Sequence, residues 1–376
     1  SMIAPTAGAA AAMDGTGGDA IEVGAADVDS DVQQRTETTL NSSQSERAER
    51  KERLLDRGTR LAPAADRTGI HPALRSASGE TVVVITVERD LDPRTLPTDG
   101  DAALELIKAD TEATQAPVVD ALTGLGADVR NQFWAGNVVT AEIDLDSTDI
   151  ERLTAIEGVK AVSPNVRYER PDPPAAGDAG AAPADHNGSY TYGLEQINVP
   201  EFENEFDTQG EGATVMIGDD GISNPEEGHP DLEFAKEAIV ENGTVDEGTL
   251  VGGAAGAHGE HTAGTATGAA HPAGDVPRYG VAPEADLLMA DVFAGGALTE
   301  DIIASMEWAA ENDADAASFS LGLPSSTGLS TFQPAYVETI EDVNAAGTVA
   351  VVSAGNSGSG DGGGPVTSPA TNFRSA

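Results

Sequence analysis

Cysteine is absent from the 376-residue sequence, which excludes a disulfide scaffold, thiol catalysis and cysteine-ligated zinc or iron–sulfur sites. No run of 18 or more apolar residues occurs either, so the sequence predicts no membrane-spanning helix. Basic side chains are scarce, with 20 Lys and Arg against 64 Asp and Glu, and the net charge is −44. A polyanion of this kind repels phosphate backbones, which makes nucleic acid a poor candidate partner.

The acidic excess is not confined to one tail. Residues 171–376 hold 34 acids and three bases, a net charge of −31, whereas residues 1–170 hold 30 acids and 17 bases. Lysine occurs only four times, yet the hydrophobic content of 39% is close to that of globular proteins. Concentrated salt screens charges over about 3 Å at 1 M, so an acidic, lysine-poor surface around an apolar core suits such a solvent. We interpret the composition as halophilic.

The sequence predicts that residues 1–78 are a leader without catalytic or ligand-binding residues. The small apolar residues at its start fit the end of a secretory signal peptide, and a flexible Ala/Gly leader fits equally well. Residues 13–43 are rich in Gly, Ser, Thr and Asp, a composition that predicts disorder.

Residues 79–170 predict a small α+β domain. We expect strands at 81–87, 128–134, 137–143 and 159–166. Helices are expected at 101–125, with an interruption near Pro117, and at 146–157. The resulting order β-α-β-β-α-β is the split βαβ, or ferredoxin-like, plan. Residues 171–189 are rich in Pro, Gly and Ala and predict an exposed linker.

Residues 190–376 alternate short apolar strands with helices of small residues. The strands are expected at 213–218, 286–293, 314–321 and 348–353. The helices are expected at 258–270, 299–312 and 333–346. This alternation predicts an α/β domain with a doubly wound parallel sheet, in which functional side chains collect at the carboxyl ends of the strands.

Three segments carry side chains suited to chemistry, although each is ambiguous alone. Asp219 ends an apolar strand, where an Asx turn or helix cap is favoured over a catalytic carboxylate when the segment is taken alone. His258 and His261 lie three residues apart among small residues, and a metal pair, a general base and simple packing remain open. Asn356 follows another buried strand, as an oxyanion donor or as a turn residue.

The order and context of these segments resemble the subtilisin-like serine proteases, or subtilases, from about Tyr192 to Ala376. Residues 258–264 (His-Gly-Glu-His-Thr-Ala-Gly) are similar to the family's His-Gly-Thr-His-Val-Ala-Gly. The other matching segments are Gly-Val-Ala-Pro at 280–283, Ser-Leu-Gly at 320–322 and Ala-Gly-Asn at 354–356. Several motifs in the family's order make the resemblance specific.

The resemblance implies a role for each matching residue. Asp219 would orient His258, His258 would act as general base and then acid, and Asn356 would donate to the oxyanion. The segment Ser320, Leu321 and Gly322 would bind the backbone of a polypeptide substrate as an added strand. Asp231 matches a position that can ligate a structural calcium, and the chemistry requires no other cofactor.

The resemblance also implies a role for residues 79–170, as an inhibitory propeptide that blocks the cleft of its own protease. Residues 166–170 would lie in the active site, and maturation would cut between about Arg170 and Ser189. The peptidase domain would be 190–376, after the linker 171–189. The whole would be a secreted precursor of the haloarchaeal type.

The family's nucleophile has no counterpart in the sequence. It lies in a Gly-Thr-Ser-Met-Ala helix start, and no Gly-Thr-Ser occurs among the 376 residues. We therefore expect a C-terminally truncated peptidase domain, inactive as it stands, from a secreted serine endopeptidase whose Ser lies beyond Ala376. The alternatives are a non-catalytic peptide-binding relative and a metal hydrolase built on His258 and His261.

The charge pattern predicts that the full-length protein depends on salt. Dilution lengthens the range of repulsion among the carboxylates, so the folded state should lose stability. Far-ultraviolet circular dichroism should show unfolding as molar sodium chloride is diluted. A signal that stays constant from low to molar salt would contradict the halophilic interpretation.

Overall fold

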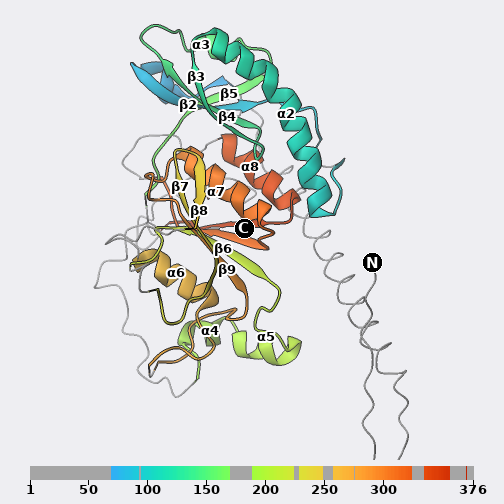
Figure 1. The fold of residues 1–376 in the computed structure, drawn as a ribbon, viewed down its shortest axis with the longest axis vertical. Helices are drawn as coiled ribbons and strands as arrows, with labels where there is room; N and C mark the ends of the chain where they lie inside the picture. The colour runs from blue at the N-terminus through green and yellow to red at the C-terminus, as the bar shows by residue number, and fades with distance from the viewer. Residues whose placement is uncertain are drawn as a thin grey trace, which may run out of the picture. The chain divides into compact units, whose positions relative to one another are not determined.

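A computed structural model of the chain describes residues 69–92, 95–169, 189–223, 228–248, 257–274, 276–323, 334–355 and 370. Two β-sheets organise these residues (Figure 1). Residues 69–164 supply the strands of the first sheet, and residues 214–352 supply those of the second. Both sheets belong to one compact unit, Arg47–Ala376.

The first sheet has five strands in the order β1-β5-β2-β4-β3. Their bounds are β1 (Gly69–Ile70), β2 (Glu80–Val87), β3 (Asp128–Phe133), β4 (Val138–Asp144) and β5 (Val159–Pro164). The 3-10 helix η2 (Pro72–Ser76) and the helices α2 (Gly100–Gly124) and α3 (Glu151–Thr154) complete this part. The predicted β-α-β-β-α-β order is present as β2-α2-β3-β4-α3-β5. The two-residue strand β1 is too short to leave a sequence pattern, and α3 is shorter than the predicted 146–157.

The helix α2 runs through Pro117, where the sequence predicted an interruption. Contacts on both sides of the proline hold the helix in place. The Gln115 amide donates to the carbonyl oxygens of Phe133 and Val138 at 2.9 and 3.2 Å, and Val118 is fully buried. These contacts offset the backbone donor that proline lacks, so the predicted break was wrong.

The second sheet has six strands in the order β11-β10-β6-β9-β7-β8. Their bounds are β6 (Thr214–Asp219), β7 (Phe234–Glu241), β8 (Thr244–Glu247), β9 (Asp286–Asp291), β10 (Ala316–Phe319) and β11 (Val349–Val352). All neighbours pair in parallel except β7 and β8. Those two form a hairpin across Asn242 and Gly243, whose positive φ angles of 53° and 73° suit a tight two-residue turn.

Helices cover both faces of the six-stranded sheet, as predicted for a doubly wound fold. Figure 1 shows α6 (Ala257–Thr267) on one side and α7 (Thr299–Glu311) with α8 (Pro334–Ala345) on the other. Two short helices, α4 (Tyr192–Gln196) and α5 (Val199–Phe206), precede the first strand. Beneath α6 lies a small apolar cluster that includes Ile217, Ala263 and Met289.

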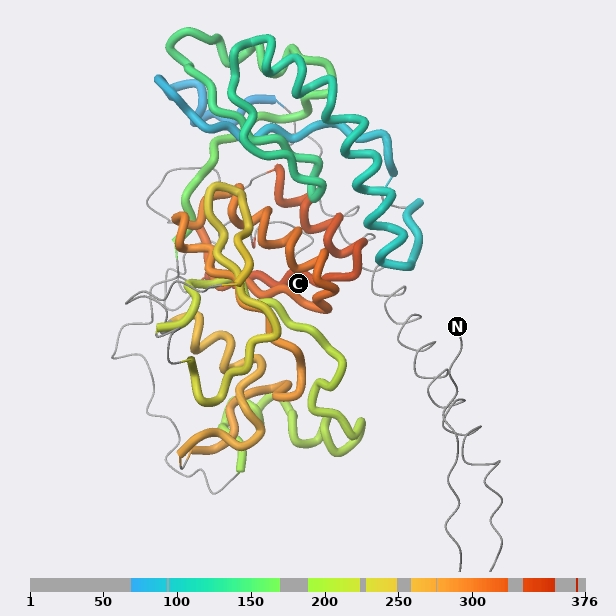
Figure 2. Tube along the Cα trace, viewed as in Figure 1, coloured from blue at the N-terminus to red at the C-terminus, as the bar shows by residue number. Residues whose placement is uncertain are grey.

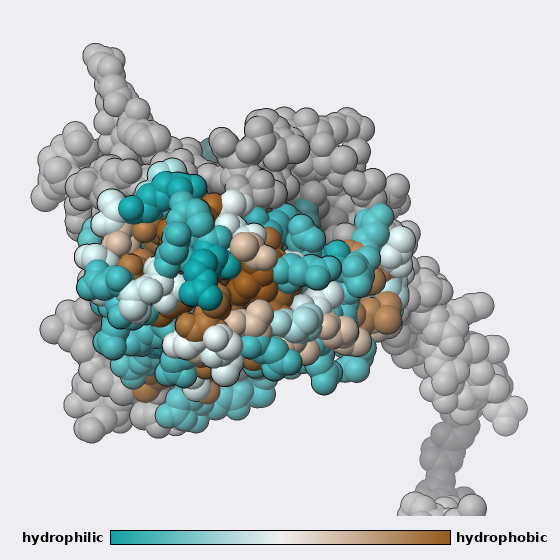
Figure 3. Space-filling model, turned by 90° about the horizontal axis from the view of Figure 1, so that it is seen from above, coloured by the Kyte–Doolittle hydropathy of each residue, from teal (hydrophilic) through white to brown (hydrophobic). Residues whose placement is uncertain are grey.

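A larger apolar cluster joins α7 and α8 to both sheets. It contains Ile303 and Val343 from these helices together with Ile107 and Phe133 from the five-stranded part. The two parts therefore share a continuous core. Viewed from above, the described surface is mostly hydrophilic, with apolar patches between the polar side chains (Figure 3).

Buried acidic side chains on α7 and α8 also face the five-stranded part. The Arg89 guanidinium binds both oxygens of Asp342 at 2.7 Å, and the Gly136 amide donates to the same carboxylate at 2.7 Å. Glu300 accepts from Asn131 and Asn165 at 3.1 and 2.8 Å. Burial raises the pKa of Asp342 to about 6, although Arg89 acts in the opposite direction.

Replacing Arg89 tests how much the fold depends on this ion pair. The two side chains are 10% and 1% exposed, so Arg89→Met leaves a buried carboxylate without its cation. We expect the variant to lose about 3–5 kcal/mol of unfolding free energy near neutral pH, measured by urea unfolding in constant salt. The loss should shrink below the pKa of Asp342, where the carboxyl group becomes neutral.

Arg75→Met is the matched control. Arg75 pairs with Glu151, but these side chains are 55% and 52% exposed, so the change should be under about 1 kcal/mol. Equal losses of unfolding free energy in the two variants would contradict the expectation that the buried Arg89–Asp342 pair stabilises the fold more than an exposed pair.

Candidate active site

The carboxyl ends of three parallel strands lie together in the six-stranded sheet. β6 lies between β10 and β9, with Gly218 opposite Phe319 and Asp219 opposite Asp291. Asp219 is the last residue of β6 and is only 1% exposed. The sheet therefore delivers a buried carboxylate to the edge where functional side chains collect in such folds.

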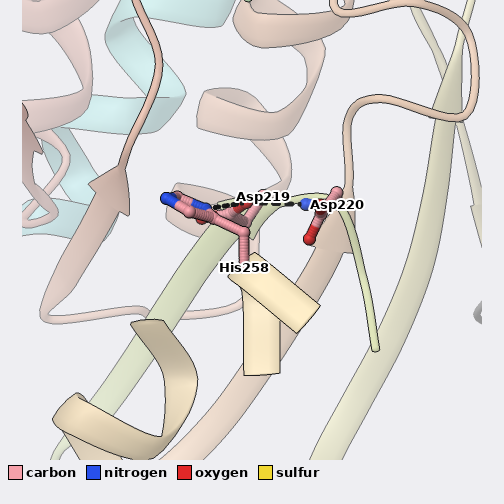
Figure 4. Close-up of side chains that lie close together, drawn as sticks. All are labelled: Asp219, Asp220 and His258. Atoms are coloured by element: carbon pink, nitrogen blue, oxygen red, sulfur yellow. Dashed lines mark hydrogen bonds and ion pairs between the residues drawn. The ribbon is translucent and has the colours of Figure 1, made fainter. Parts of the chain in front are cut away.

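His258 meets this carboxylate from the first turn of α6. Its Nδ1 atom lies 2.8 and 3.0 Å from Asp219 Oδ1 and Oδ2, and the two side chains face one another in Figure 4. A carboxylate can only accept, so Nδ1 carries the proton in this contact. The other ring nitrogen, Nε2, is then the basic atom of the neutral imidazole.

Two further donors hold the Asp219 carboxylate. The Asp220 amide donates to Oδ1 at 2.9 Å, and the Thr262 hydroxyl lies 3.0 Å from Oδ2. Thr262 was missed in the sequence, although it lies one helical turn after His258 and so faces the same side of α6. Bonds from three directions fix the orientation of Asp219 and, through it, that of the imidazole.

Asp220 lies beside the Asp219–His258 pair, and its carboxylate is within 4.8 Å of ligand atoms of both residues. The Asp220 Oδ1 atom accepts the Gly259 amide at 2.7 Å, in the first turn of α6, where the helix dipole favours a negative charge. Gly259 permits this close packing, because a Cβ there would lie 2.1 Å from the Gly221 carbonyl oxygen.

Glu260 adds a second link between α6 and the turn after β6. Its two carboxylate oxygens accept the amide and the hydroxyl of Ser223 at 2.9 and 3.0 Å. Glu260 stands where the family motif has Thr, and the structure gives it a role. Asp220 and Glu260 together tie the Asp219 turn to the helix that carries His258.

A third carboxylate, Asp291, lies beside this pair. The Asp291 Oδ1 atom accepts the amides of Phe293 and Ala294 at 3.0 Å. Its other oxygen is directed toward the turn, since a Cβ at Gly221 would lie 3.3 Å from Oδ2. Burial, reinforced by the charges of Asp220 and Asp219, raises the pKa of Asp291 to about 6.

Ser320, Leu321 and Gly322 follow β10 at the same edge of the sheet. Gly322 exchanges two backbone hydrogen bonds of 3.0 Å with Glu169, an antiparallel bridge. On the opposite side, Arg167 bridges Leu298, with the Tyr168 amide donating to the Ala297 carbonyl at 2.8 Å. Residues 166–169 thus lie as an added strand between two segments, and Figure 2 shows their green trace leaving the five-stranded sheet.

The added strand is anchored by an aromatic side chain. Tyr168 is buried in the large apolar cluster that also contains Leu321 and Ile302. Its ring meets that of Tyr336 edge to face, with the centroids 5.7 Å apart. Backbone pairing on both sides and this buried ring fix the register of residues 166–169.

Comparison with known proteins matches residues 210–372 to the model of the subtilase family, Peptidase_S8. This match assigns residues 210–372 to a subtilase-family domain, the subtilase domain. Among curated relatives, the minor extracellular protease Vpr of Bacillus subtilis is 28% identical over 325 residues, which cover 80% of this chain and 37% of Vpr. Subtilisin E of Bacillus subtilis is 30% identical over 246 residues, covering 64% of this chain and 55% of the relative.

The chain thus spans between about a third and a little over half of these relatives' length. Among solved structures, fervidolysin from Fervidobacterium pennivorans is similar, with a TM-score of 0.50 and 20% identity over 81% of this chain and 43% of that one. The subtilase domain has a subtilisin-like α/β fold, which confirms the predicted fold class. None of the described helices combines the length and apolarity that crossing a membrane requires.

Two predicted site residues remain to be placed. Asn356 lies outside the described residues. His261 is exposed on α6, and the group of potential metal ligands found in the described part of the chain consists of Asp219, Asp220 and His258 without it. The two histidines are therefore not brought together in a three-ligand site.

The surroundings of Asp231 do not fit a calcium ion. Its Oδ1 atom accepts the Ala273 amide at 2.6 Å, and its Oδ2 atom accepts the Tyr279 hydroxyl at 2.5 Å. Calcium requires about six to eight oxygen ligands, whereas each oxygen of this carboxylate accepts a proton donor instead.

The raised pKa of Asp291 predicts that the stability of the subtilase domain depends on pH. Because its pKa is about 6 rather than 3.8, the folded state holds a proton that the unfolded state releases between these pH values. This contribution is fully present below about pH 4 and is lost as the pH rises through 6. Asp291→Asn cannot titrate, so its unfolding free energy should fall less than that of the wild type between pH 4 and 7. Parallel pH profiles from urea unfolding would contradict this.

Proposed function

We propose that the subtilase domain is the catalytic part of a secreted serine endopeptidase that hydrolyses peptide bonds with an Asp/His/Ser triad. The observation that carries the proposal is the Asp219–His258 contact, in which a fixed carboxylate holds the Nδ1–H tautomer. In this mechanism His258 Nε2 takes the proton of the serine hydroxyl as it attacks the substrate carbonyl. His258 then gives that proton to the leaving amine.

Asn356 is proposed to donate a side-chain hydrogen bond to the oxyanion, on the strength of the Ala-Gly-Asn motif alone. The serine is proposed to lie in sequence that follows Ala376, in a Gly-Thr-Ser helix start. No such tripeptide occurs among the 376 residues. Without the nucleophile, only the residual effects of binding and oxyanion donors would remain.

Residues 79–170 are proposed to act as an intramolecular inhibitor of the same domain. The support is the path of residues 166–169, which pair with Gly322 and Leu298 as a substrate backbone would. Maturation is then proposed to cut between about Arg170 and Ser189. Extracellular relatives such as Vpr support secretion, and the net charge of −44 supports work in concentrated salt.

The proposed triad is tested by Asp219→Asn in the full-length protein. An Asn at this position can donate to Nδ1 and would favour the wrong imidazole tautomer, so kcat on a peptide substrate should fall by about 10⁴-fold. A serine-directed phosphonate should label the wild type, and His258→Ala should abolish the labelling. His261→Ala is the control, because this exposed histidine should leave activity within a few-fold of the wild type.

Two results would overturn the proposal. One is a complete gene without a further Gly-Thr-Ser, and the other is a full-length protein that binds peptides without reacting with the phosphonate. The second result would identify a non-catalytic peptide-binding relative. Activity lost to a chelator but indifferent to the phosphonate would instead favour metal hydrolysis, provided that the fold survives the chelator.

A further inference from the structure

The loop before β9 is held by Asp231 at a position where the family resemblance implied calcium. Asp231 is buried and accepts three backbone or side-chain donors from this loop. Its carbonyl oxygen accepts the Ala269 amide at 3.0 Å, in addition to the bonds from Ala273 and Tyr279 to its carboxylate. Asp231 therefore fixes the loop at three points between residues 269 and 279, through two side-chain bonds and one backbone bond.

Among the described residues, no set of ligands for a cation surrounds the Asp231 carboxylate. A hollow of about 620 Å³ beside Asp231 is also lined by Glu233, Glu284 and Asp286. These acids do not form, in the described part of the chain, a group of three whose oxygen atoms lie within 4.8 Å of one another. Each oxygen of the Asp231 carboxylate already accepts a hydrogen bond, from the Ala273 amide or the Tyr279 hydroxyl, which reduces its need for a cation.

Tyr279 connects Asp231 to the helix α6. Its ring packs so closely on this helix that a Cβ at Gly268 would lie 2.4 Å from ring atom Cε2, and one at Gly264 would lie 3.1 Å away. Burial and the hydrogen bond to Asp231 raise the pKa of the Tyr279 hydroxyl, so it remains a proton donor. The loop and the helix that carries His258 are thus joined through one phenol group.

Arg278 supplies a positive charge within the same loop. Its side chain is 4% exposed and pairs with Glu203 at 2.5 Å. It also donates to the carbonyl oxygens of Gly280 and Val281 at 3.0 and 3.1 Å, and it lies over the Tyr190 ring. Arg278 therefore donates hydrogen bonds both to carbonyl oxygens and to a carboxylate. These are the oxygen groups that a hard cation such as calcium would otherwise bind.

We propose that this chain replaces a structural calcium at Asp231 with its own side chains. The Tyr279 hydroxyl donates to the Asp231 carboxylate, and the Tyr279 ring packs against α6. Arg278 donates to the carbonyl oxygens of Gly280 and Val281 and pairs with Glu203 in α5. The loop is thereby cross-linked by groups that no chelator can remove. The inference concerns stability alone and does not depend on the proposed peptidase activity.

The test compares thermal unfolding of the 376-residue protein with and without calcium in constant high salt. The wild-type Tm should be the same in millimolar calcium chloride and in excess EDTA. Tyr279→Phe leaves one buried carboxylate oxygen without its donor and should lower Tm by about 3–10 °C in both solutions. Tyr192→Phe is the matched control, because this hydroxyl is exposed and bonds only to Gln196 among the contacts resolved for it, so Tm should change little.

Asp231→Asn makes the result decisive if calcium does raise the wild-type Tm. A calcium effect that is unchanged in Asp231→Asn belongs to another site, and the proposal stands if Tyr279→Phe is destabilised. A calcium effect that disappears in Asp231→Asn would overturn the proposal. A Tm of Tyr279→Phe equal to that of the wild type would overturn it as well.

Discussion

Burying the Asp219 carboxylate imposes the constraint from which the rest of the candidate active site follows. A buried negative charge is stable only when protein donors replace its water. Here those donors come from the turn after β6 and from α6, as the Asp220 amide, the Thr262 hydroxyl and the His258 ring. Supplying them forces α6 to approach β6 closely, which explains the small residues on this helix. The same contacts that stabilise the charge also set the imidazole tautomer.

A second set of carboxylates, on α7 and α8, is paired with bases from the preceding part of the chain. Residues 69–169 direct several of their few bases at α7 and α8, through the pairs Arg89–Asp342, Lys108–Glu311, Arg130–Glu300 and Lys160–Glu338. Backbone amides contribute too, since Ala135 donates to Glu307 at 2.7 Å. Because the acidic half has few cations of its own, the preceding part of the chain supplies the neutralising groups for this face.

The sequence predicted the elements that have a regular pattern. Apolar runs located β6, β9, β10 and β11, and small residues around His258 located α6. It failed where tertiary contacts decide the outcome, as at Pro117, where the buried Gln115 and Val118 keep α2 continuous. The β7–β8 hairpin was missed although Asn242-Gly243 is a strong turn signal.

For the site, motif order was sufficient to pair Asp219 with His258, whereas the supporting contacts required coordinates. Thr262, Asp220 and Glu260 act through hydrogen bonds whose partners lie about 40 residues away along the chain, as in the bond from Gly259 to Asp220.

Residues 166–169 have another physical consequence, because they belong to the same chain as the two segments with which they pair. Tethering holds them at an effective concentration on the order of millimolar beside these segments, so a weakly bound free peptide would compete poorly. A cut of the kind proposed for maturation would remove the tether. Occupancy would then depend on dilution, and the volume around the protein would decide how long residues 166–169 stay bound.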